Sequence, residues 1–257
     1  MIASSPAFQA ALPPLAEGGR AEAVVQRIGE AVTLGVLVDG DQLPSENDLA
    51  VQLGVAVGTI REALASLREE GVIETRRGRG GGSFVRASDD RIAHLHLQRL
   101  KTASMAKLRD IGDEKAAVSG TAARLAAERA DPDLGRRLKD RLATLRNAST
   151  VADCRRAESG FHIEIAMASQ SVRLSHAEVR LQAELGPLVW LPDHAPDADE
   201  VAEQLDAVMV AVVSGDGQQA RSRIEQHVLS GSRCAVAAHL STVEPSPARR
   251  DPGARHE

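Results

Sequence analysis

Tyrosine is absent from this chain of 257 residues, and only four side chains are aromatic: Phe8, Phe84, Phe161 and Trp190. A hydrophobic core must therefore be filled by Ala, Val, Leu and Ile, which favours helices. The scarcity of rings also excludes a stacking platform for single-stranded nucleic acid, because such platforms need exposed aromatic side chains. A hydrophobic fraction of 43% and a charged fraction of 26% are typical of a globular protein.

The overall charge is −5, so the chain is not a protein that coats nucleic acid through bulk positive charge, although a local basic patch is compatible with it. Two cysteines, Cys154 and Cys234, are too few for a disulfide framework or a zinc finger. No apolar run approaches the roughly 18 to 20 residues that span a bilayer. The N-terminus also lacks the pattern of a signal peptide. We therefore expect a cytoplasmic protein with no membrane partner.

Changes in the hydrophobic pattern divide the chain into two domains and two ends. Between residues 20 and 86 the pattern changes several times over short distances, whereas residues 89–242 carry only helical stripes. The segment 1–19 mixes proline and glycine with alanine and predicts a flexible arm. Residues 243–257 combine three prolines with charges and predict a flexible tail.

The sequence of the first domain predicts three helices followed by a β-hairpin. Apolar residues at helical spacing predict a helix over 20–34, and Ser45 is a good N-cap for a second, short helix. A third helix ends at Gly71. The segments 72–75 and 83–85 then predict two short strands around a glycine-rich loop. Three helices with a tight turn between the second and third, followed by a hairpin, are typical of a winged helix-turn-helix.

This fold predicts binding to double-stranded DNA. The N-terminal residues of the second helix of a helix-turn-helix meet base edges in the major groove, and here they are Ala56, Val57, Gly58, Thr59 and Arg61. A flexible arginine loop suits insertion into a minor groove, where narrow A·T tracts concentrate negative potential. Residues 75–87 contain no acidic side chain, and their basic side chains are Arg76, Arg77, Arg79 and Arg86.

A module that docks onto another protein is the alternative interpretation of this domain. Residues 20–86 contain eight basic and ten acidic residues, a net charge of −2, which is unfavourable for a DNA-binding domain. The acidic residues, however, cluster at 39–48 and 62–74, whereas the basic ones gather on the wing. We therefore favour DNA binding over docking alone.

The order and spacing of residues 43–50, 54–55 and 60–71 resemble the signature of the GntR family of bacterial transcription regulators. Their sequences are Leu-Pro-Ser-Glu-Asn-Asp-Leu-Ala, Gly-Val and Ile-Arg-Glu-Ala-Leu-Ala-Ser-Leu-Arg-Glu-Glu-Gly. The resemblance extends over residues 20–86 and implies a domain that binds operator DNA as a dimer. The DNA contacts that it implies are made by Asn47, Ala56, Val57, Thr59 and Arg61, with Arg77 and Gly78 in the wing and Arg79 beside them.

Three positions depart from the usual pattern of that family. Ala56 stands where Ser or Thr is usual, which removes about 1 kcal/mol of N-capping. Val57 stands where Arg is common, which removes a bidentate guanine contact worth about 1–3 kcal/mol of discrimination. Asn47 likewise replaces a frequent arginine. We expect an operator that differs from the usual one, or weaker specific affinity.

The second domain is predicted to be an antiparallel bundle of about six or seven helices, which makes the whole chain mainly α. A break is expected at Gly112. The helical stripes lie at about 89–109, 113–130, 132–147, 153–170, 172–190, 197–214 and 216–240.

One pair in this domain has the spacing of a chelating site, because Glu158 and His162 are four residues apart and share a helix face. This stretch resembles the Asp-x-x-Phe-His element of the all-helical effector domain, called FCD, of FadR-like GntR regulators. Gly215, Ala220 and His227 follow the Gly-Asp…Ala…His spacing of the same domain. The resemblance covers about residues 110–230.

The FCD resemblance implies a metal held by one Asp and three His in a pocket for a small carboxylate metabolite. Glu158 takes the place of the Asp, and His162 and His227 are retained, but Leu205 stands where the remaining His is expected. The three ligands are compatible with Zn²⁺, Mn²⁺ or Ni²⁺, with water completing the coordination. A pocket without metal is the alternative.

These features together predict a ligand-responsive transcription regulator that binds operator DNA as a homodimer and a small-molecule effector in its helical domain. Arg109 and Lys115 are candidates for neutralising an effector carboxylate, or else are exposed charges. One alternative is a winged-helix docking protein with impaired operator recognition. Another is a metal-dependent enzyme that uses Glu158 as an acid or base, which no nucleophile constellation or nucleotide loop in the sequence supports.

Overall fold

The structure is a computed structural model in which residues 12, 14, 15, 20–78, 80–86, 88–129 and 131–243 are described. Of the predicted arm, only Leu12, Pro14 and Leu15 belong to this part. Leu12 is buried against the N-terminal domain, and the Leu15 N–H donates to the carbonyl oxygen of Leu53 at 2.9 Å. Residues 244–257 of the predicted tail and Arg79 of the wing lie outside the described residues.

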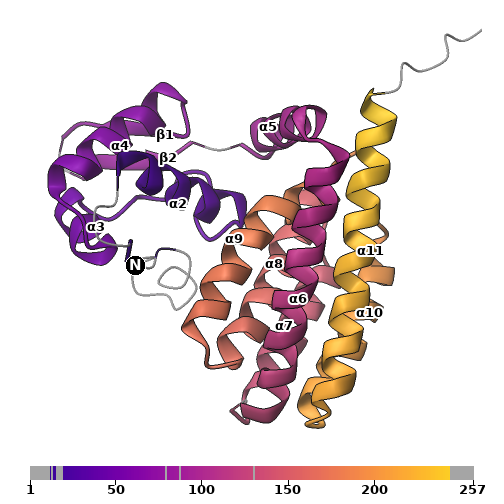
Figure 1. The fold of residues 1–257 in the computed structure, drawn as a ribbon. Helices are drawn as coiled ribbons and strands as arrows, with labels where there is room; N and C mark the ends of the chain where they lie inside the picture. The colour runs from indigo at the N-terminus through magenta and orange to yellow at the C-terminus, as the bar shows by residue number, and fades with distance from the viewer. Residues whose placement is uncertain are drawn as a thin grey trace, which may run out of the picture.

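Two lobes make up the described chain (Figure 1). The indigo and purple lobe contains α2 (Ala21–Thr33), α3 (Glu46–Leu53), α4 (Val57–Glu69) and the strands β1 (Ile73–Arg76) and β2 (Gly82–Val85). The other lobe is a helical bundle made of α5 (Asp89–Thr102), α6 (Met105–Arg129), α7 (Leu134–Arg146), α8 (Val151–Ala168), α9 (Val172–Val189), α10 (Ala198–Val213) and α11 (Gly217–Val243). The predicted fold class, a winged helix-turn-helix followed by a mainly antiparallel helical bundle, is confirmed.

Local signals set the helices of the winged domain. The Ser45 hydroxyl accepts a hydrogen bond from the Asp48 N–H at 3.2 Å, as expected of an N-cap. Gly54 ends α3 in the left-handed conformation at φ 68°, which glycine adopts without strain. Ala56 stands at the N-cap of α4 and supplies no side-chain hydrogen bond. Helix α4, which is predicted to lie in the major groove, therefore begins without a side-chain cap.

The wing is a two-stranded antiparallel hairpin. Ile73 pairs with Val85, and Arg76 pairs with Gly82 at the end next to the loop. Gly81 is required in that loop, because a Cβ there would lie 2.4 Å from the carbonyl oxygen of Arg76. The predicted strands are present, with bounds shifted by one residue.

The long helices α6 and α11 lie side by side and run antiparallel (Figure 1). The predicted break at Gly112 is wrong, because Gly112 lies inside α6. A Cβ at position 112 would lie 2.3 Å from the hydroxyl oxygen of Ser232, so the glycine lets α11 approach closely. The break falls between Thr102 and Met105 instead, where the Ser104 hydroxyl accepts from the Lys107 N–H at 3.1 Å.

Aliphatic side chains fill the core of the bundle, as the scarcity of aromatic residues predicts. Phe161 and Trp190 are the aromatic members of this core among the described residues. The remaining buried members are leucine, isoleucine, valine, alanine and Cys154. Against this background, any charged side chain in the bundle interior requires a partner.

The two lobes contact each other through the end of α2. A small apolar cluster, separate from both domain cores, is formed by Leu34, Ile163, Val179 and Ala183. Gly35 follows with φ +69°, and a Cβ at this position would lie 2.2 Å from Cδ of Arg156 on α8. The winged domain therefore packs directly on α8 and α9.

None of the described helices is, by itself, both long and apolar enough to cross a membrane. Taken together, α3 and α4 are long and apolar enough, but the chain bends by 110° between these two helices.

Candidate nucleic-acid interface and buried polar centre

The predicted DNA-contacting residues of the helix-turn-helix lie on its surface. Asn47, Ala56 and Arg61 are exposed, and Val57 and Thr59 are half-buried at the start of α4. All five residues are therefore at least partly accessible near the turn between α3 and α4.

Arg61 is held on this surface by a single exposed ion pair. Its Nε donates to Oε2 of Glu46 at 2.7 Å, and 67% of the Arg61 side chain is exposed. An exposed pair of this kind contributes only about 0–1 kcal/mol. Arg61 can therefore exchange the Glu46 carboxylate for a phosphate or a guanine edge at little cost.

The wing arginines fall into two groups. Arg76 lies over the Phe84 ring at 4.3 Å, and its Nε donates to Glu74 at 2.8 Å. Arg86 contacts the same Glu74 carboxylate at 3.7 Å. These contacts tie both arginines to the hairpin, although each side chain is still more than half exposed.

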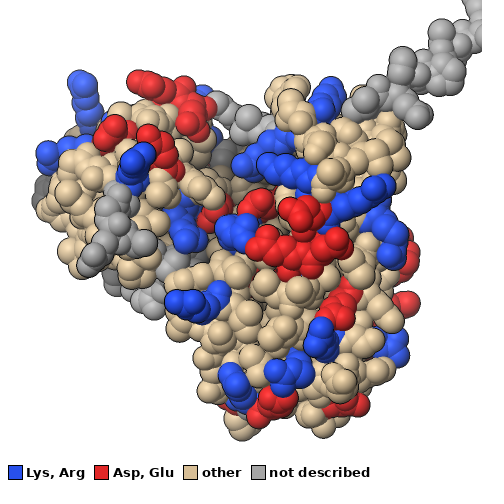
Figure 2. Space-filling view, in the orientation of Figure 1, with Lys and Arg blue, Asp and Glu red and all other residues tan. Residues whose placement is uncertain are grey.

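Arg77 and Gly78 are exposed at the hairpin loop, and Arg77 forms no ion pair with the described residues. Arg68 of α4 lies 3.5 Å from the Thr75 hydroxyl, which ties α4 to β1. Basic and acidic side chains are interspersed on the visible face of this lobe (Figure 2). The positive charge is therefore local to the loop rather than spread over the domain.

Glu158 and His162 of α8 meet His227 of α11 inside the bundle. Glu158, His162 and His227 are 7%, 1% and 5% exposed. Glu158 Oε1 lies 2.8 Å from His227 Nε2 and 3.9 Å from His162 Nε2, and the two imidazole rings stack at 5.4 Å. One ligand atom from each side chain lies within 4.8 Å of the others. The structure thus brings together the three candidate metal ligands, which we call the buried centre.

Three residues that the sequence analysis missed hold the buried centre in place. Trp190 Nε1 donates to Oε2 of Glu158. Gln204 Oε1 lies 3.0 Å from His227 Nδ1, and Glu178 Oε1 lies 3.3 Å from His162 Nδ1. His227 Nδ1 is thus hydrogen-bonded to Gln204, whereas His162 Nδ1 lies near Glu178 without a hydrogen bond among the described residues, and both rings turn Nε2 toward Glu158. This is the arrangement of outer partners that orients histidines in metal sites.

Lys115 does not lie on the surface as an exposed charge: it is 3% exposed. Its ammonium contacts Oε1 of Glu178, and the Ser119 hydroxyl donates to Oε2 of Glu178 at 2.7 Å. The carboxylate that Lys115 neutralises is therefore the protein's own. Glu178 in turn links Lys115 to His162.

Arg109 and Leu205 lie in different surroundings, one at the surface and one in the apolar core. Arg109 is exposed and lines a groove between α6 and α11. It lies six residues before Lys115, about 120° away around the helix. Leu205 is fully buried in the apolar core of the bundle, and its neighbour Gln204 is the α10 residue that contacts His227.

Burial and partners set the charges of the centre. Burial acts to raise the pKa of Glu158, but the hydrogen bond and the charge of His227 outweigh it and lower that pKa to about 2. Burial also acts to raise the pKa of Glu178, but the charges and hydrogen bonds of Lys115 and His162 together outweigh it and lower that pKa to about 2. Burial and the Lys115 charge lower the pKa of His162. Both carboxylates are thus ionised and His162 is neutral near pH 7, the form in which imidazole binds metal.

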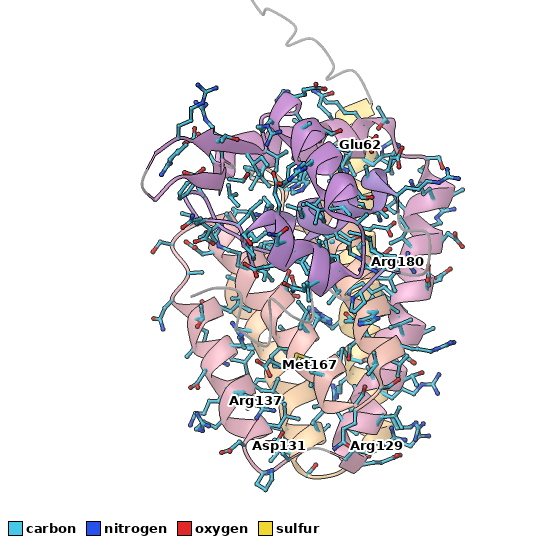
Figure 3. The ribbon with its side chains drawn as sticks, turned by 90° about the vertical axis from the view of Figure 1, so that its left-hand side faces the viewer. Glu62, Arg129, Asp131, Arg137, Met167 and Arg180 are labelled. Carbon is cyan, nitrogen blue, oxygen red and sulfur yellow. The ribbon has the colours of Figure 1, made fainter. Side chains whose placement is uncertain are left out.

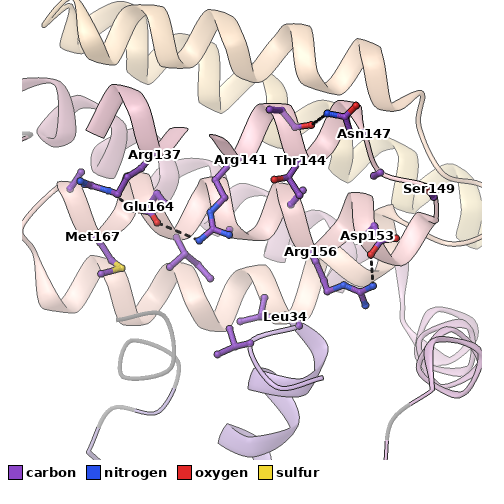
Figure 4. Close-up of a pocket in the computed structure, with 18 of the residues that line it drawn as sticks. Leu34, Arg137, Arg141, Thr144, Asn147, Ser149, Asp153, Arg156, Glu164 and Met167 are labelled. Carbon is purple, nitrogen blue, oxygen red and sulfur yellow. Dashed lines mark hydrogen bonds and ion pairs between the residues drawn. The ribbon is translucent and has the colours of Figure 1, made fainter. Parts of the chain in front are cut away.

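A large cleft of about 1080 Å³ runs along α7 and α8 on the side that faces residues 34–36 (Figure 4). Arg137 contacts Asp131 at 2.9 Å and Glu164 at 3.0 Å, and Arg156 contacts Asp153 at 2.6 Å. Asp131 and Arg137 lie at the end of the bundle remote from the winged domain (Figure 3). The charges of this cleft are largely paired with each other.

A winged helix-turn-helix joined to a helical domain with a closed polar centre defines a DNA-binding regulator with a sensor domain. Residues 20–82 match the model of bacterial regulatory proteins of the gntR family, and residues 110–230 match the FCD domain. The chain belongs to the GntR family and carries an FCD domain.

Relatives support this assignment over most of the chain. The putative HTH-type transcriptional regulator RmpR of Mycobacterium gastri is 39% identical over 218 residues, which cover 83% of this chain and 79% of RmpR. The putative L-lactate dehydrogenase operon regulatory protein of Escherichia coli K12 is 32% identical over 249 residues, which cover 91% of this chain and 88% of that protein.

Among solved structures, E. coli McbR/YncC has a TM-score of 0.50 at 18% sequence identity, covering 87% of this chain and 98% of its own. At that identity the likeness shows the fold alone.

The chain is therefore a ligand-responsive transcription regulator. GntR regulators bind operator DNA, and they bind small-molecule effectors through the FCD domain. The docking protein and the metal-dependent enzyme are not favoured, because the family and these relatives are transcription regulators.

Proposed function

We propose that this regulator binds operator DNA as a homodimer and senses a small carboxylate at the buried centre, with a divalent cation between Glu158, His162 and His227. The observation that supports the sensing role is the orientation of this centre, in which three ligand atoms face one point while outer partners hold the rings.

The DNA-binding part of the proposal rests on the exposed residues around α4 and the wing. A single winged helix reads one half-site, and two half-sites one helical turn apart require two chains, which is the reason for proposing a homodimer. The proposed contacts to DNA are made by Asn47, Ala56, Val57, Thr59, Arg61, Arg77, Gly78 and Arg79.

The donor set of the centre fits a transition-metal cation. One carboxylate oxygen and two imidazole nitrogens are suitable for Zn²⁺, Mn²⁺ or Ni²⁺. Both ring nitrogens of His227 face oxygen atoms, of Gln204 on one side and Glu158 on the other. With a hydrogen on Nδ1 toward Gln204, Nε2 is free to bind a cation shared with Glu158. When bound, such a cation supplies the positive charge that attracts an effector carboxylate.

The centre is connected to the winged domain by sequence neighbours. Ile163 follows His162, and Val179 follows Glu178; both belong to the apolar cluster around Leu34 at the end of α2. The side chains of the centre are almost fully buried, so an effector must displace one of the surrounding helices to reach them, and α8 and α9 are two of these helices. A displacement of either helix moves the surface on which α2 rests, which gives effector binding a route to the orientation of the DNA-binding domain.

The E. coli relative is named for an L-lactate dehydrogenase operon, so L-lactate is the first effector to test. The probe DNA is the region that flanks the regulator's own gene. Fluorescence anisotropy of the full chain should give tight, salt-dependent binding, and sedimentation should give two chains per site. L-lactate should change DNA affinity, and the DNA should change L-lactate affinity by the same factor. Tight L-lactate binding with no mutual effect would remove the sensing mechanism.

Metal binding has its own test, since Trp190 is the single tryptophan of the chain and donates to Glu158. Zn²⁺, Mn²⁺ and Ni²⁺ are titrated into chelator-treated protein while Trp190 fluorescence is recorded, and elemental analysis counts the ions. One ion per chain is expected, with loss in the Glu158→Gln variant and retention in a His194→Gln control. Absence of binding by all three ions would contradict the metal, and the DNA assay would still test the regulator.

A further inference from the structure

A separate pocket of about 530 Å³ lies where the two lobes join. Its walls come from α2 of the winged domain, from the base of the wing, from α5 and from α9 of the bundle. The volume is in the range of small-molecule sites. Its apolar lining is formed by Val25, Val32, Val72, Ile92 and Ala183.

The pocket has a buried polar atom without a partner. His96 lines it and is only 3% exposed, and its Nδ1 has no hydrogen-bond partner among the described residues. Most buried polar groups in proteins are hydrogen-bonded, so an unpaired atom of this kind is a candidate contact for a bound ligand. A ligand oxygen at this position would accept a hydrogen bond from the ring.

The charge around His96 favours an anion. Three acidic side chains also line the pocket, but Glu30 is paired with Arg27 and Glu184 with Arg180, and Glu70 has a partner as well. Arg99, by contrast, is exposed and forms no ion pair with the described residues.

Positive charges also act on the imidazole ring of His96. Burial, together with the positive charges of Arg155 and Arg99, lowers the pKa of His96 to about 3. Two arginines therefore lie close enough to the His96 ring to act on its charge.

We propose that this junction pocket binds a small amphipathic carboxylate, with its carboxylate between His96 and Arg99 and its apolar chain between α2 and α9. Because α2 belongs to the DNA-binding domain and α9 to the bundle, the bound molecule would fix the orientation of one lobe on the other. This second ligand position adds to the proposed function, and binding at it requires neither operator DNA nor a metal at the buried centre.

Octanoate is a suitable probe, measured by calorimetry on the full chain, and octanol is its uncharged counterpart. We expect one octanoate per chain and weaker binding of octanol. Gly29 of α2 lines the pocket, and a Cβ there would meet nothing within 4 Å, so Gly29→Phe introduces a bulky side chain at the pocket wall. It should weaken octanoate binding at least tenfold, whereas the Gly29→Ala control should retain it.

The charge requirement is tested on α5. Arg99→Gln should weaken octanoate binding about fivefold, as expected for loss of a partly exposed ion pair. Lys101→Gln removes a charge from the same helix outside the pocket and should leave the affinity unchanged. Equal affinity of the Arg99→Gln and native chains would overturn the assignment of the carboxylate to this end.

The location of the ligand is tested against the buried centre. Glu158→Gln should leave octanoate binding intact, and octanoate should not change Trp190 fluorescence. Loss of binding in Glu158→Gln, unchanged binding in Gly29→Phe, or no octanoate binding at all would each overturn the proposal. Retained octanoate binding by a chain that ignores operator DNA would refute the proposed function and leave this inference standing.

Discussion

The winged domain and the bundle use polar side chains in opposite ways. Around α4 and the wing, Arg61 and Arg77 are exposed and weakly held, so a ligand can engage them without moving the chain. In the buried centre, the polar side chains contact one another inside the bundle, and an effector cannot reach them unless helices move. The first arrangement suits binding to an external surface, and the second suits a switch, because any ligand must change the structure that holds it.

The largest expected effect tests the buried side of this comparison. Glu178→Gln leaves the buried Lys115 without its counter-charge and should lower the free energy of unfolding by about 3–5 kcal/mol. Glu184→Gln, on the same helix, removes a partly exposed partner of Arg180 and should cost at most about 1 kcal/mol. Urea unfolding in the presence of a chelator measures both. Equal losses in the two variants would show that burial does not distinguish these pairs.

The exposed side is tested by Arg61→Ala, which should weaken binding to the DNA flanking the gene by about 2 kcal/mol, or roughly 30-fold. Its unfolding free energy should stay within about 0.5 kcal/mol of the native value, because the Glu46 pair is exposed. Arg173→Ala, an exposed change on α9, serves as the control for general charge effects. If the two variants bind DNA alike, Arg61 is not a specific contact.

His96, between the two regions, predicts a pH dependence. Its pKa is about 3 in the fold against 6.5 in the unfolded chain, so the unfolded chain binds the extra proton below pH 6.5. Stability therefore falls as the pH drops, by about 1.4 kcal/mol between pH 7 and 5.5 from this group. His96→Leu should lose that part of the dependence. His94→Leu, on the exposed face of α5, should keep it in the same urea titrations.

The smallest expected effect concerns the uncapped start of α4. Ala56→Ser restores a side-chain acceptor at the N-cap, where the backbone is already extended at φ −67° and ψ 148°. It should raise stability by about 1 kcal/mol in thermal unfolding. Ala65→Ser, inside the same helix, should lower stability slightly, since serine is the poorer helix former. A loss of stability in Ala56→Ser would mean that the turn cannot accept the cap.

Features that depend on sequence neighbours were predictable. Ser45 is the N-cap that its position indicated, and Glu158 and His162 share a face because they are four residues apart. Gly112 misled the prediction, since a glycine inside a helix resembles a break until the neighbouring helix that needs the space is known.

The outer partners of the centre come from other helices, and no local spacing connects them to it. Glu178, Gln204 and Trp190 lie on α9, on α10 and at the end of α9. A weak signal existed for Glu178, which interrupts an apolar stripe that contains Leu174, Leu181 and Leu185. Lys115 interrupts a similar stripe on α6. Two opposite charges on two apolar faces are a pattern that a search for buried pairs would detect.

The absence of a side chain at Gly35 has a consequence for the spacing between the operator half-sites that the regulator binds. A Cβ on Gly35 would lie 2.2 Å from Cδ of Arg156, so this close contact helps to set the angle between the winged domain and the bundle. A methyl group added at Gly35 would change how the winged domain packs on α8. In the proposed homodimer, this change would alter the distance between the two winged domains. Variants at Gly35 would therefore prefer a different number of base pairs between half-sites, while the sequence preference within each half-site would stay the same.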